Sequence, residues 1–180
     1  ITMNSSTPPA LNVQRSIYRF LWDFPEARDP KRNINLIGSF SSVNPNSELY
    51  SLLRNAGFED ILQVSGCRSF EEFLKMRDSA FNIMLKPFGR LACADMERKL
   101  GIPYTRKYIR YRAEGVAESY RELGEFLGCR LDYQPYYEAA LKKIAAHTER
   151  LSALRIAVSE EVNGSAFELA CALKEYGAQI

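Results

Sequence analysis

The stretch that decides the fold is residues 81–104, FNIMLKPFGRLACADMERKLGIPY. We expect a buried strand over Phe81–Leu85 and a helix that begins after Pro87 and ends at Gly101, because proline and glycine mark helix starts and ends in this way. A further strand is predicted around Tyr104–Ile109. Two strands joined by one helix are typical of a βαβ unit, in which the strands are parallel.

The same alternation continues on both sides of this stretch. The predicted segments are a strand over 35–40, a turn over 41–46, a helix around 49–56, a strand over 61–64, a helix opened by a Ser69–Glu72 capping box, and a helix ending at Gly128. The predicted fold class is therefore α/β, with a Rossmann-like parallel sheet of about four strands flanked by helices over residues 33–130. Its functional loops should lie at the carboxyl ends of the strands, at 39–46, 65–69, 86–90 and 110–114.

Three further segments flank this predicted domain. Residues 1–32 contain an amphipathic helix over Ala10–Trp22 and a proline-containing linker, and we interpret them as the tail of a preceding domain. The apolar stripe of that helix is assigned to Ala10, Val13, Ile17, Phe20 and Leu21. Residues 131–153 are expected to form a long connecting helix. Residues 154–180, with a strand at 154–158 and a helix from Ser165 to Gly177, are interpreted as the truncated start of a third Rossmann-like domain, so the chain is expected to be a fragment.

Composition and cysteine spacing narrow the class of protein. With 46% hydrophobic and 26% charged residues the composition is that of a globular protein, and its net charge of +2 demands no particular partner. No apolar run reaches the ~20 residues that span a bilayer. The four cysteines are far apart, which argues against a self-contained metal site and against a disulfide scaffold. We therefore expect a cytoplasmic protein with reduced thiols and no membrane partner.

Two strand-end loops could bind an anion. The sequence has no GxGxxG or Walker A motif, but the loop Gly38–Ser42 could offer backbone N–H groups, unless it is a plain strand-to-turn connection. Lys86 and Arg90 flank Gly89 at a predicted helix N-terminus, which suits an anionic group; the alternative is a solvated loop.

Cysteine and histidine supply few candidates for catalysis. Cys67 lies in a strand-end loop between Gly66 and Arg68, and a neighbouring cation would lower its pKa and favour a thiolate, although a structural role is the preferred interpretation. The other three cysteines, Cys93, Cys129 and Cys171, are expected to be structural. His147, the single histidine, falls among charged residues of a predicted helix, and we interpret it as a solvated helix position. A single histidine and the lack of a GxSxG motif argue against a serine-hydrolase triad of the usual kind.

Residues 104–112, YTRKYIRYR, interleave aromatic and basic side chains. Such a strand could bind nucleic acid or another anionic ligand, with cations on phosphates and tyrosines stacked on bases. The interpretation we favour is a strand whose side chains face an adjoining domain or an acidic partner, because the charge of the remaining chain is balanced.

The strand Phe81–Leu85 and the phrase Met96-Glu97-x-x-x-Gly101-Ile102-Pro103-Tyr104 together resemble the middle domain of nitrogenase component 1 proteins. This superfamily includes molybdenum–iron protein subunits, cofactor-assembly scaffolds and subunits of dark-operative protochlorophyllide reductase. The upstream segments Asn35–Gly38 and Val64–Gly66, each followed by a predicted helix, fall in the order found in the family. The resemblance spans about residues 33–180.

The resemblance implies an iron–sulfur oxidoreductase subunit of three Rossmann-like domains. Such a subunit pairs with a homologous component 1 subunit and receives electrons from an ATP-dependent iron protein. The family's bridging-cluster cysteines belong to the first domain, and its cofactor-binding histidine belongs to the third and would lie beyond Ile180. The family's cofactor-binding cysteine lies at the end of the third strand of the middle domain. The corresponding position in this sequence is Leu85-Lys86, where neither residue has a thiol.

The expected assignment of sites is correspondingly modest. No catalytic residue and no metal ligand is assigned to this chain, and an iron–sulfur cluster or metallocofactor is expected only in a longer parent protein. The residues predicted to border the family's cofactor cavity are Lys86, Gly89, Arg90, Gly66 and Cys67. The chain alone is expected to be inactive.

Overall fold

The computed structural model describes residues 8–23, 29, 31–159 and 165–180. The predicted linker around Pro25 and Pro30 lies largely outside the described residues, as do residues 1–7. The chain divides into two compact units, Ile1–Tyr108 and Ile109–Ile180, which are described one at a time.

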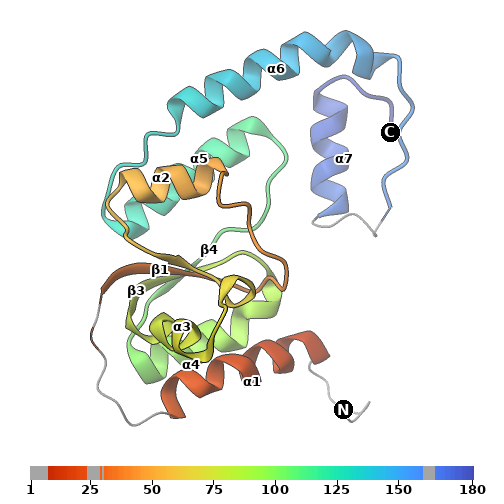
Figure 1. Ribbon diagram of the computed structural model, residues 1–180. Helices are drawn as coiled ribbons and strands as arrows, with labels where there is room; N and C mark the ends of the chain where they lie inside the picture. The colour runs from red at the N-terminus through yellow and green to blue at the C-terminus, as the bar shows by residue number, and fades with distance from the viewer. Residues whose placement is uncertain (1–7, 24–28, 30, 160–164) are drawn as a thin grey trace. The chain divides into compact units, whose positions relative to one another are not determined.

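The first unit is built around a parallel sheet. Its strands are β1 (Lys31–Ile37), β2 (Ile61–Leu62), β3 (Ser79–Met84) and β4 (Tyr104–Arg106), in the order β2-β1-β3-β4. Helix α2 (Glu48–Asn55) lies on one face, and α3 (Phe70–Leu74) and α4 (Arg90–Leu100) lie on the other (Figure 1). Right-handed crossovers place these helices on opposite faces of the sheet, because the chain crosses the sheet in one direction from β1 to β2 and in the opposite direction from β2 to β3 and β4. The predicted Rossmann-like α/β fold is confirmed.

The strands end earlier than the apolar pattern predicts. β1 ends at Ile37 instead of Phe40, because Gly38 turns the chain with a φ of +94°. β2 is two residues long, and a 3₁₀ turn, η1 (Val64–Gly66), replaces its predicted end. Two more 3₁₀ turns, η2 (Lys75–Asp78) and η3 (Pro87–Gly89), come before β3 and α4. The glycine ends of the helices are as predicted, and Gly101 adopts the left-handed conformation after α4.

Buried amides join the two central strands. The Asn35 side chain donates to Asn82 Oδ1 at 2.9 Å and to the Met76 carbonyl at 2.7 Å, and it accepts from the Ser79 hydroxyl at 2.9 Å. Around them lies the apolar core, formed by Tyr18, Leu21, Ile37, Phe73, Met76, Met84, Ala92, Cys93, Met96 and Ile102. Each polar atom of Asn35 that enters the core therefore has a partner.

Helix α1 (Pro9–Asp23) packs against α4 and η3 within this unit. The predicted helix is confirmed, but its predicted apolar stripe is right only in part: Leu21 is buried and Ile17 packs against the core, as predicted. The buried residues are Leu11, Gln14, Tyr18 and Leu21, whereas Val13 and Phe20 are 42% and 53% exposed. The helix is therefore rotated about its axis relative to the prediction. In this orientation Arg15 forms an ion pair with Asp95 of α4, with an N–O distance of 2.5 Å.

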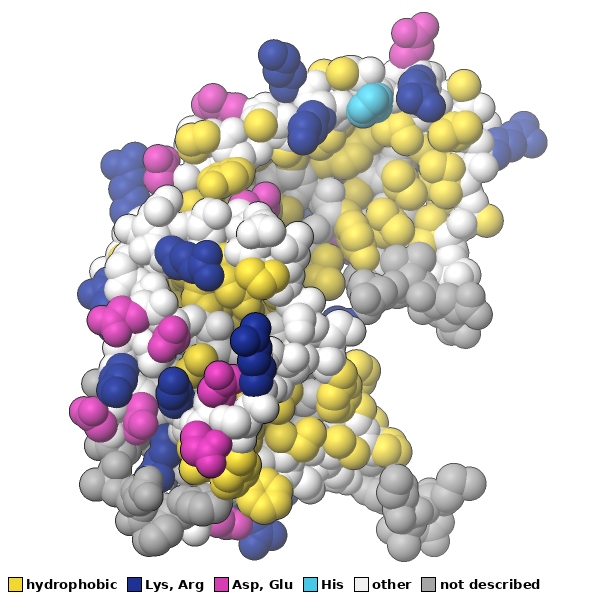
Figure 2. Space-filling view, in the orientation of Figure 1, with side chains coloured by type: hydrophobic (Ala, Val, Ile, Leu, Met, Phe, Trp, Pro, Cys, Tyr) yellow, Lys and Arg dark blue, Asp and Glu magenta, His cyan; other side chains and the backbone are white. Residues whose placement is uncertain are grey.

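The described part of the second unit contains three helices, α5 (Ala113–Leu127), α6 (Gln134–Ser152) and α7 (Ala166–Glu175), and α5 packs against α6. The predicted strand over 154–158 is reduced to one parallel bridge between Arg155 and Gln179. Apolar side chains gather on the visible face of this unit (Figure 2), and Phe167 on α7 is 88% exposed. Parallel strands are usually covered on both faces. Most residues around Arg155 are exposed, so the segments around Arg155 and Gln179 form a single bridge and no regular strand.

Candidate functional site

The order of the strands locates a topological switch point in the first unit, which we call the crevice. After β1 the chain continues to β2 on one side, and β3 then pairs with the opposite side of β1. In open parallel sheets, ligands bind outside the carboxyl ends of the strands at such a switch point. Here the switch point lies between the loop Gly38–Ser42, which follows β1, and the segment Lys86–Arg90, which follows β3. Sequence analysis proposed both as anion-binding loops.

The two loops meet through glycines. A Cβ atom on Gly38 would lie 2.4 Å from the Lys86 carbonyl oxygen and 3.0 Å from the Gly89 nitrogen. A Cβ atom on Gly89 would in turn lie 3.0 Å from the Gly38 Cα atom. The backbones therefore touch at the floor of the crevice, and both residues have to be glycine for the strands to end side by side. Gly89 is buried, so its contribution is backbone packing.

Side-chain hydrogen bonds fix the loop after β1. Gln63, which is 4% exposed, accepts from the Val43 N–H at 3.0 Å and donates to the Ser41 carbonyl at 2.6 Å. The Ser39 hydroxyl accepts from the Ser41 N–H at 3.2 Å. One backbone donor of the predicted anion cradle, the Ser41 N–H, is thus already used within the protein, as is the N–H of Val43, which directly follows the cradle. Sequence analysis missed the role of Gln63, whose only signal was a polar residue inside an apolar strand pattern.

Two cationic side chains lie at the other wall of the crevice. Lys86 is half-buried and directly precedes η3, and Arg90 is exposed in the first turn of α4. Phe88, which is 40% exposed, lies between them in the chain. A helix N-terminus with two nearby cations favours an anionic group, which is the chemistry predicted for this loop.

Gly66 and Cys67 belong to a different cavity. They help to line a hollow of about 300 Å³ beside β2, whose other walls come from residues after β1, from α2 and from α3, and from no residue after β3. The structure therefore does not bring them together with Lys86, Gly89 and Arg90.

The surroundings of Cys67 favour the structural interpretation over the thiolate alternative. Burial raises the pKa of the thiol, and the nearby Glu72 carboxylate raises it further. Glu72 also accepts from the Arg68 N–H at 2.6 Å, and the thiol donates to the Gln63 carbonyl at 3.4 Å. A thiol that stays protonated is a poor metal ligand and a poor nucleophile.

The described residues do not fit an iron–sulfur cluster. Burial raises the pKa of Cys93 to about 12, and this thiol lies in the apolar core. His147 is exposed on α6 (Figure 2, cyan). Within the described part of the chain, no group of three or more His, Cys, Asp or Glu side chains could hold a metal ion. The end of β3 offers Leu85 and Lys86, neither of which ligates iron, so no step through a cluster is derived.

The basic run after Pro103 is divided between a short strand and a loop. In the second unit Arg112 pairs with Glu175 at 3.1 Å and with Glu168 at 3.9 Å, and the Tyr111 N–H donates to Glu168 at 2.7 Å. Arg112 therefore faces carboxylates of its own unit from outside the strand, since β4 ends at Arg106.

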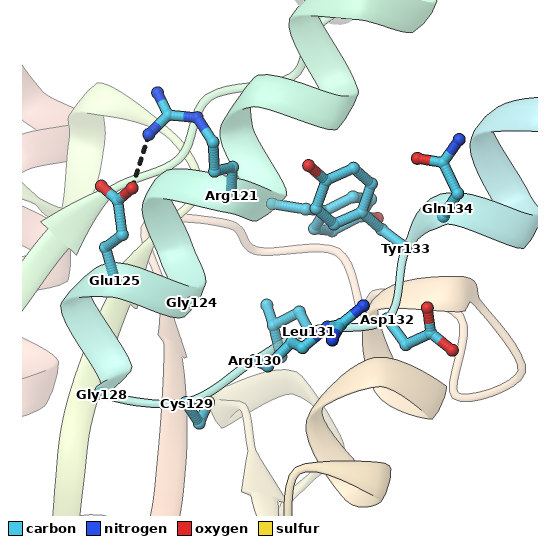
Figure 3. A pocket seen from close by; sticks show the side chains of 11 residues that line it. Arg121, Gly124, Glu125, Gly128, Cys129, Arg130, Leu131, Asp132, Tyr133 and Gln134 are labelled. Carbon is cyan, nitrogen blue, oxygen red and sulfur yellow. Dashed lines mark hydrogen bonds and ion pairs between the residues drawn. The ribbon is translucent and has the colours of Figure 1, made fainter.

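A second cavity, of about 580 Å³, lies between α5 and the start of α6 (Figure 3). Its walls include the stacked rings of Tyr120 and Tyr133, whose centroids are 6.1 Å apart. The Arg121 guanidinium that borders it is held by Glu125 at 2.5 Å and by Glu118 at 3.6 Å. Sequence analysis did not predict this cavity, and its Arg121 guanidinium is already paired with carboxylates of the chain.

None of the described helices combines the length and the apolar character needed to cross a membrane. A search of curated proteins returned no match. The family model for nitrogenase component 1 type oxidoreductases, in contrast, matches residues 10–180. Since this match covers nearly the whole sequence, the chain belongs to the nitrogenase component 1 type oxidoreductase family.

Proposed function

We propose that this chain is the middle domain, with flanking segments, of a nitrogenase-like component 1 subunit. The observation that carries the proposal is the family match over residues 10–180, and the parallel sheet with its switch-point crevice supports it. In the proposed division, residues 33–130 form the middle domain, and residues 1–32 are the end of a first domain. Residues 131–153 contain a helix that connects the middle domain to a third domain, which begins with residues 154–180. The parent protein would transfer electrons through iron–sulfur clusters onto a bound substrate or cofactor precursor.

Within that protein the proposed task of this chain is to border the cofactor cavity. Lys86 and Arg90 supply positive charge beside the crevice, and Gly89 and Gly38 let the two loops come close enough to form its floor. Gly66 and Cys67 line the adjoining hollow beside β2. The clusters themselves would be held by residues outside this chain, because the described part of the chain holds no group of three or more His, Cys, Asp or Glu side chains that could bind a metal ion.

The proposed partners follow from membership of the family. The parent subunit would pair with a homologous component 1 subunit and receive electrons from an ATP-dependent iron protein, in the cytoplasm. The chain by itself would have no oxidoreductase activity.

Anaerobic reconstitution of the purified chain with iron and sulfide tests the assignment of clusters to other parts of the parent protein. We expect a colourless protein with no stoichiometric iron after desalting. A stable brown holoprotein with stoichiometric iron would overturn the proposal, and a Cys67→Ala variant would then show whether this thiol is a ligand.

The role of the cations is tested separately by titrating the chain with sulfate and following amide chemical shifts. We expect saturable shifts in residues 38–42 and 86–90, and we expect the double variant Lys86→Met, Arg90→Met to lose them. Arg98→Met is the matched control, because Arg98 lies at the other end of α4, is 66% exposed, and pairs with Asp95. If the double variant binds sulfate as the wild type does, the cations do not form the anion site.

A further inference from the structure

Helix α1 turns two polar side chains into the interior of the first unit. Gln14 and Tyr18 are both 0% exposed and share the buried stripe of the helix with Leu11 and Leu21. The elements against which α1 packs are α4, η3 and η2. The polar groups therefore lie in an apolar interface, next to a core cluster that includes Tyr18 itself.

Neither side chain has a hydrogen-bond partner among the described residues. The orphaned atoms are Gln14 Nε2, Gln14 Oε1 and Tyr18 Oη. The buried amides of Asn35 and Gln63 in the same unit are, in contrast, each held by two or more hydrogen bonds. An orphaned buried donor or acceptor lowers the folding equilibrium constant by about 5- to 150-fold, so native interiors supply a partner, which is often an ordered water.

The spacing of the two residues places them on the same face of the helix. Side chains four residues apart are neighbours on a helix face. Together they present the amide N–H groups and carbonyl oxygen of Gln14 and the hydroxyl of Tyr18, which can donate and accept. Water has the same mixture of donors and acceptors.

The character of the interface determines what can bind. Burial raises the pKa of Tyr18, and the thiols of Cys93 and Cys67 raise it further, so the phenol stays neutral. A charged ligand here would lose its hydration, and Arg15 and Asp95, which lie in the same interface, already pair with each other, which disfavours ions. The geometry points to a site for internal water, held jointly by Gln14 and Tyr18 between α1 and the elements on which it packs. Because one of these elements is η3, which directly follows Lys86, the water would belong to the scaffold that positions the candidate crevice.

A double-mutant cycle tests the shared site. The variants are Gln14→Met, which keeps the side-chain volume, Tyr18→Phe, and the two combined, each unfolded in urea with Trp22 fluorescence as the probe. If one water bridges both groups, each single variant destabilises the fold, and the double variant loses no more than the worse single one. The expected coupling is about 5-fold or more in the unfolding equilibrium constant. Singles that stabilise the fold, or effects of either sign that add, would overturn the proposal.

Two further measurements keep the result unambiguous. The exposed pair Asn12 and Ser16 has the same spacing on the same helix, so a cycle of alanine substitutions there is the matched control and should show no coupling. In the unmodified chain, magnetisation transfer from long-lived water to the Gln14 side-chain amide is expected by NMR. If the Gln14 amide resonances are assigned and resolved and no such transfer is seen, the proposal is overturned. Because this measurement uses the unmodified chain, it holds even if a variant fails to fold.

Discussion

Substitution of Gly38 by alanine should destabilise the first unit more than the same substitution at Gly66, Gly89 or Gly101. Two separate effects act at Gly38. Its φ of +94° is costly for any residue with a Cβ atom, at about 1–2 kcal/mol. The new Cβ would also lie 2.4 Å from the Lys86 carbonyl oxygen. Because this oxygen belongs to the backbone, it cannot move away without shifting the loop after β3. Overpacking of this kind costs about 1–3 kcal/mol more.

Two other glycines separate the two effects. Gly101 has a φ of +67° and no atom within 4 Å of the place that a Cβ would take, so Gly101→Ala carries the conformational cost alone. Gly89 has a φ of −77°, which alanine tolerates, but its Cβ would meet Gly38 and Ile37 at 2.9–3.0 Å, so Gly89→Ala carries the steric cost alone. Gly66 has no positive φ, and no atom lies within 4 Å of the place that its Cβ would take. Gly66→Ala should therefore leave the free energy of unfolding nearly unchanged. We expect Gly38→Ala to lose about 2–5 kcal/mol, roughly the sum of the other two losses.

Urea unfolding measured by far-ultraviolet circular dichroism and by the fluorescence of Trp22 gives the free energies. Trp22 is the single tryptophan, lies on α1 and packs against the core of the first unit, so its emission reports on that unit. A loss for Gly38→Ala no greater than that for Gly101→Ala would show that the backbones do not touch, and the described floor of the crevice would be wrong.

Three further outcomes are expected. Asp95→Asn weakens the ion pairs that Asp95, itself 7% exposed, makes with exposed arginines, and should cost the first unit about 1 kcal/mol in urea unfolding; no change would show that Arg15 does not anchor α1. Tyr176→Phe removes the hydroxyl that accepts from the Ala113 N–H at 2.8 Å, and should cost the second unit about 1 kcal/mol by circular dichroism, with protection of the Ala113 amide from hydrogen exchange reduced. Burial raises the pKa of Cys93 from 9.0 to about 12, so the stability that its neutral thiol contributes is complete below pH 9 and declines as the pH rises from about 9 to about 12. Urea midpoints over that range should fall more steeply for the wild type than for Cys93→Ala, and parallel curves would contradict the shift.

Much of the fold could be predicted because its signals are local. Glycine after an apolar helical stripe marks the end of α2, α4 and α5, and each of those glycines has a positive φ. The ends of the strands could not be read in the same way. β1 stops at Ile37 because Gly38 meets Lys86 and Gly89 across the sheet, and this contact joins residues about fifty positions apart in the sequence, beyond any local window.

The rotation of α1 was misjudged for a related reason. Val13, Ile17 and Phe20 form an apolar stripe as regular as the stripe that is buried, so periodicity alone does not choose between them. The choice depends on Tyr18 and Leu21 entering the core and on Arg15 meeting Asp95, all of which are tertiary contacts. A buried Gln14 is the residue that the pattern argued against most strongly, and it is also the residue whose polar atoms remain to be satisfied.

The candidate site shows the same division between what is near in sequence and what is near in space. The segment Lys86–Arg90 was found because the rule for strand ends needs only the order of elements. The thiolate alternative for Cys67 fails because its neighbour in sequence, Arg68, is not the charged group that acts on the thiol. In the structure, Glu72 lies one helical turn further on and is the charge that acts on the thiol, since the capping geometry of α3 directs that carboxylate back toward Arg68. A cysteine followed by an arginine therefore predicts a thiolate only where no capping carboxylate returns to the same loop, and Ser69 with Glu72 is the sequence signal that one does.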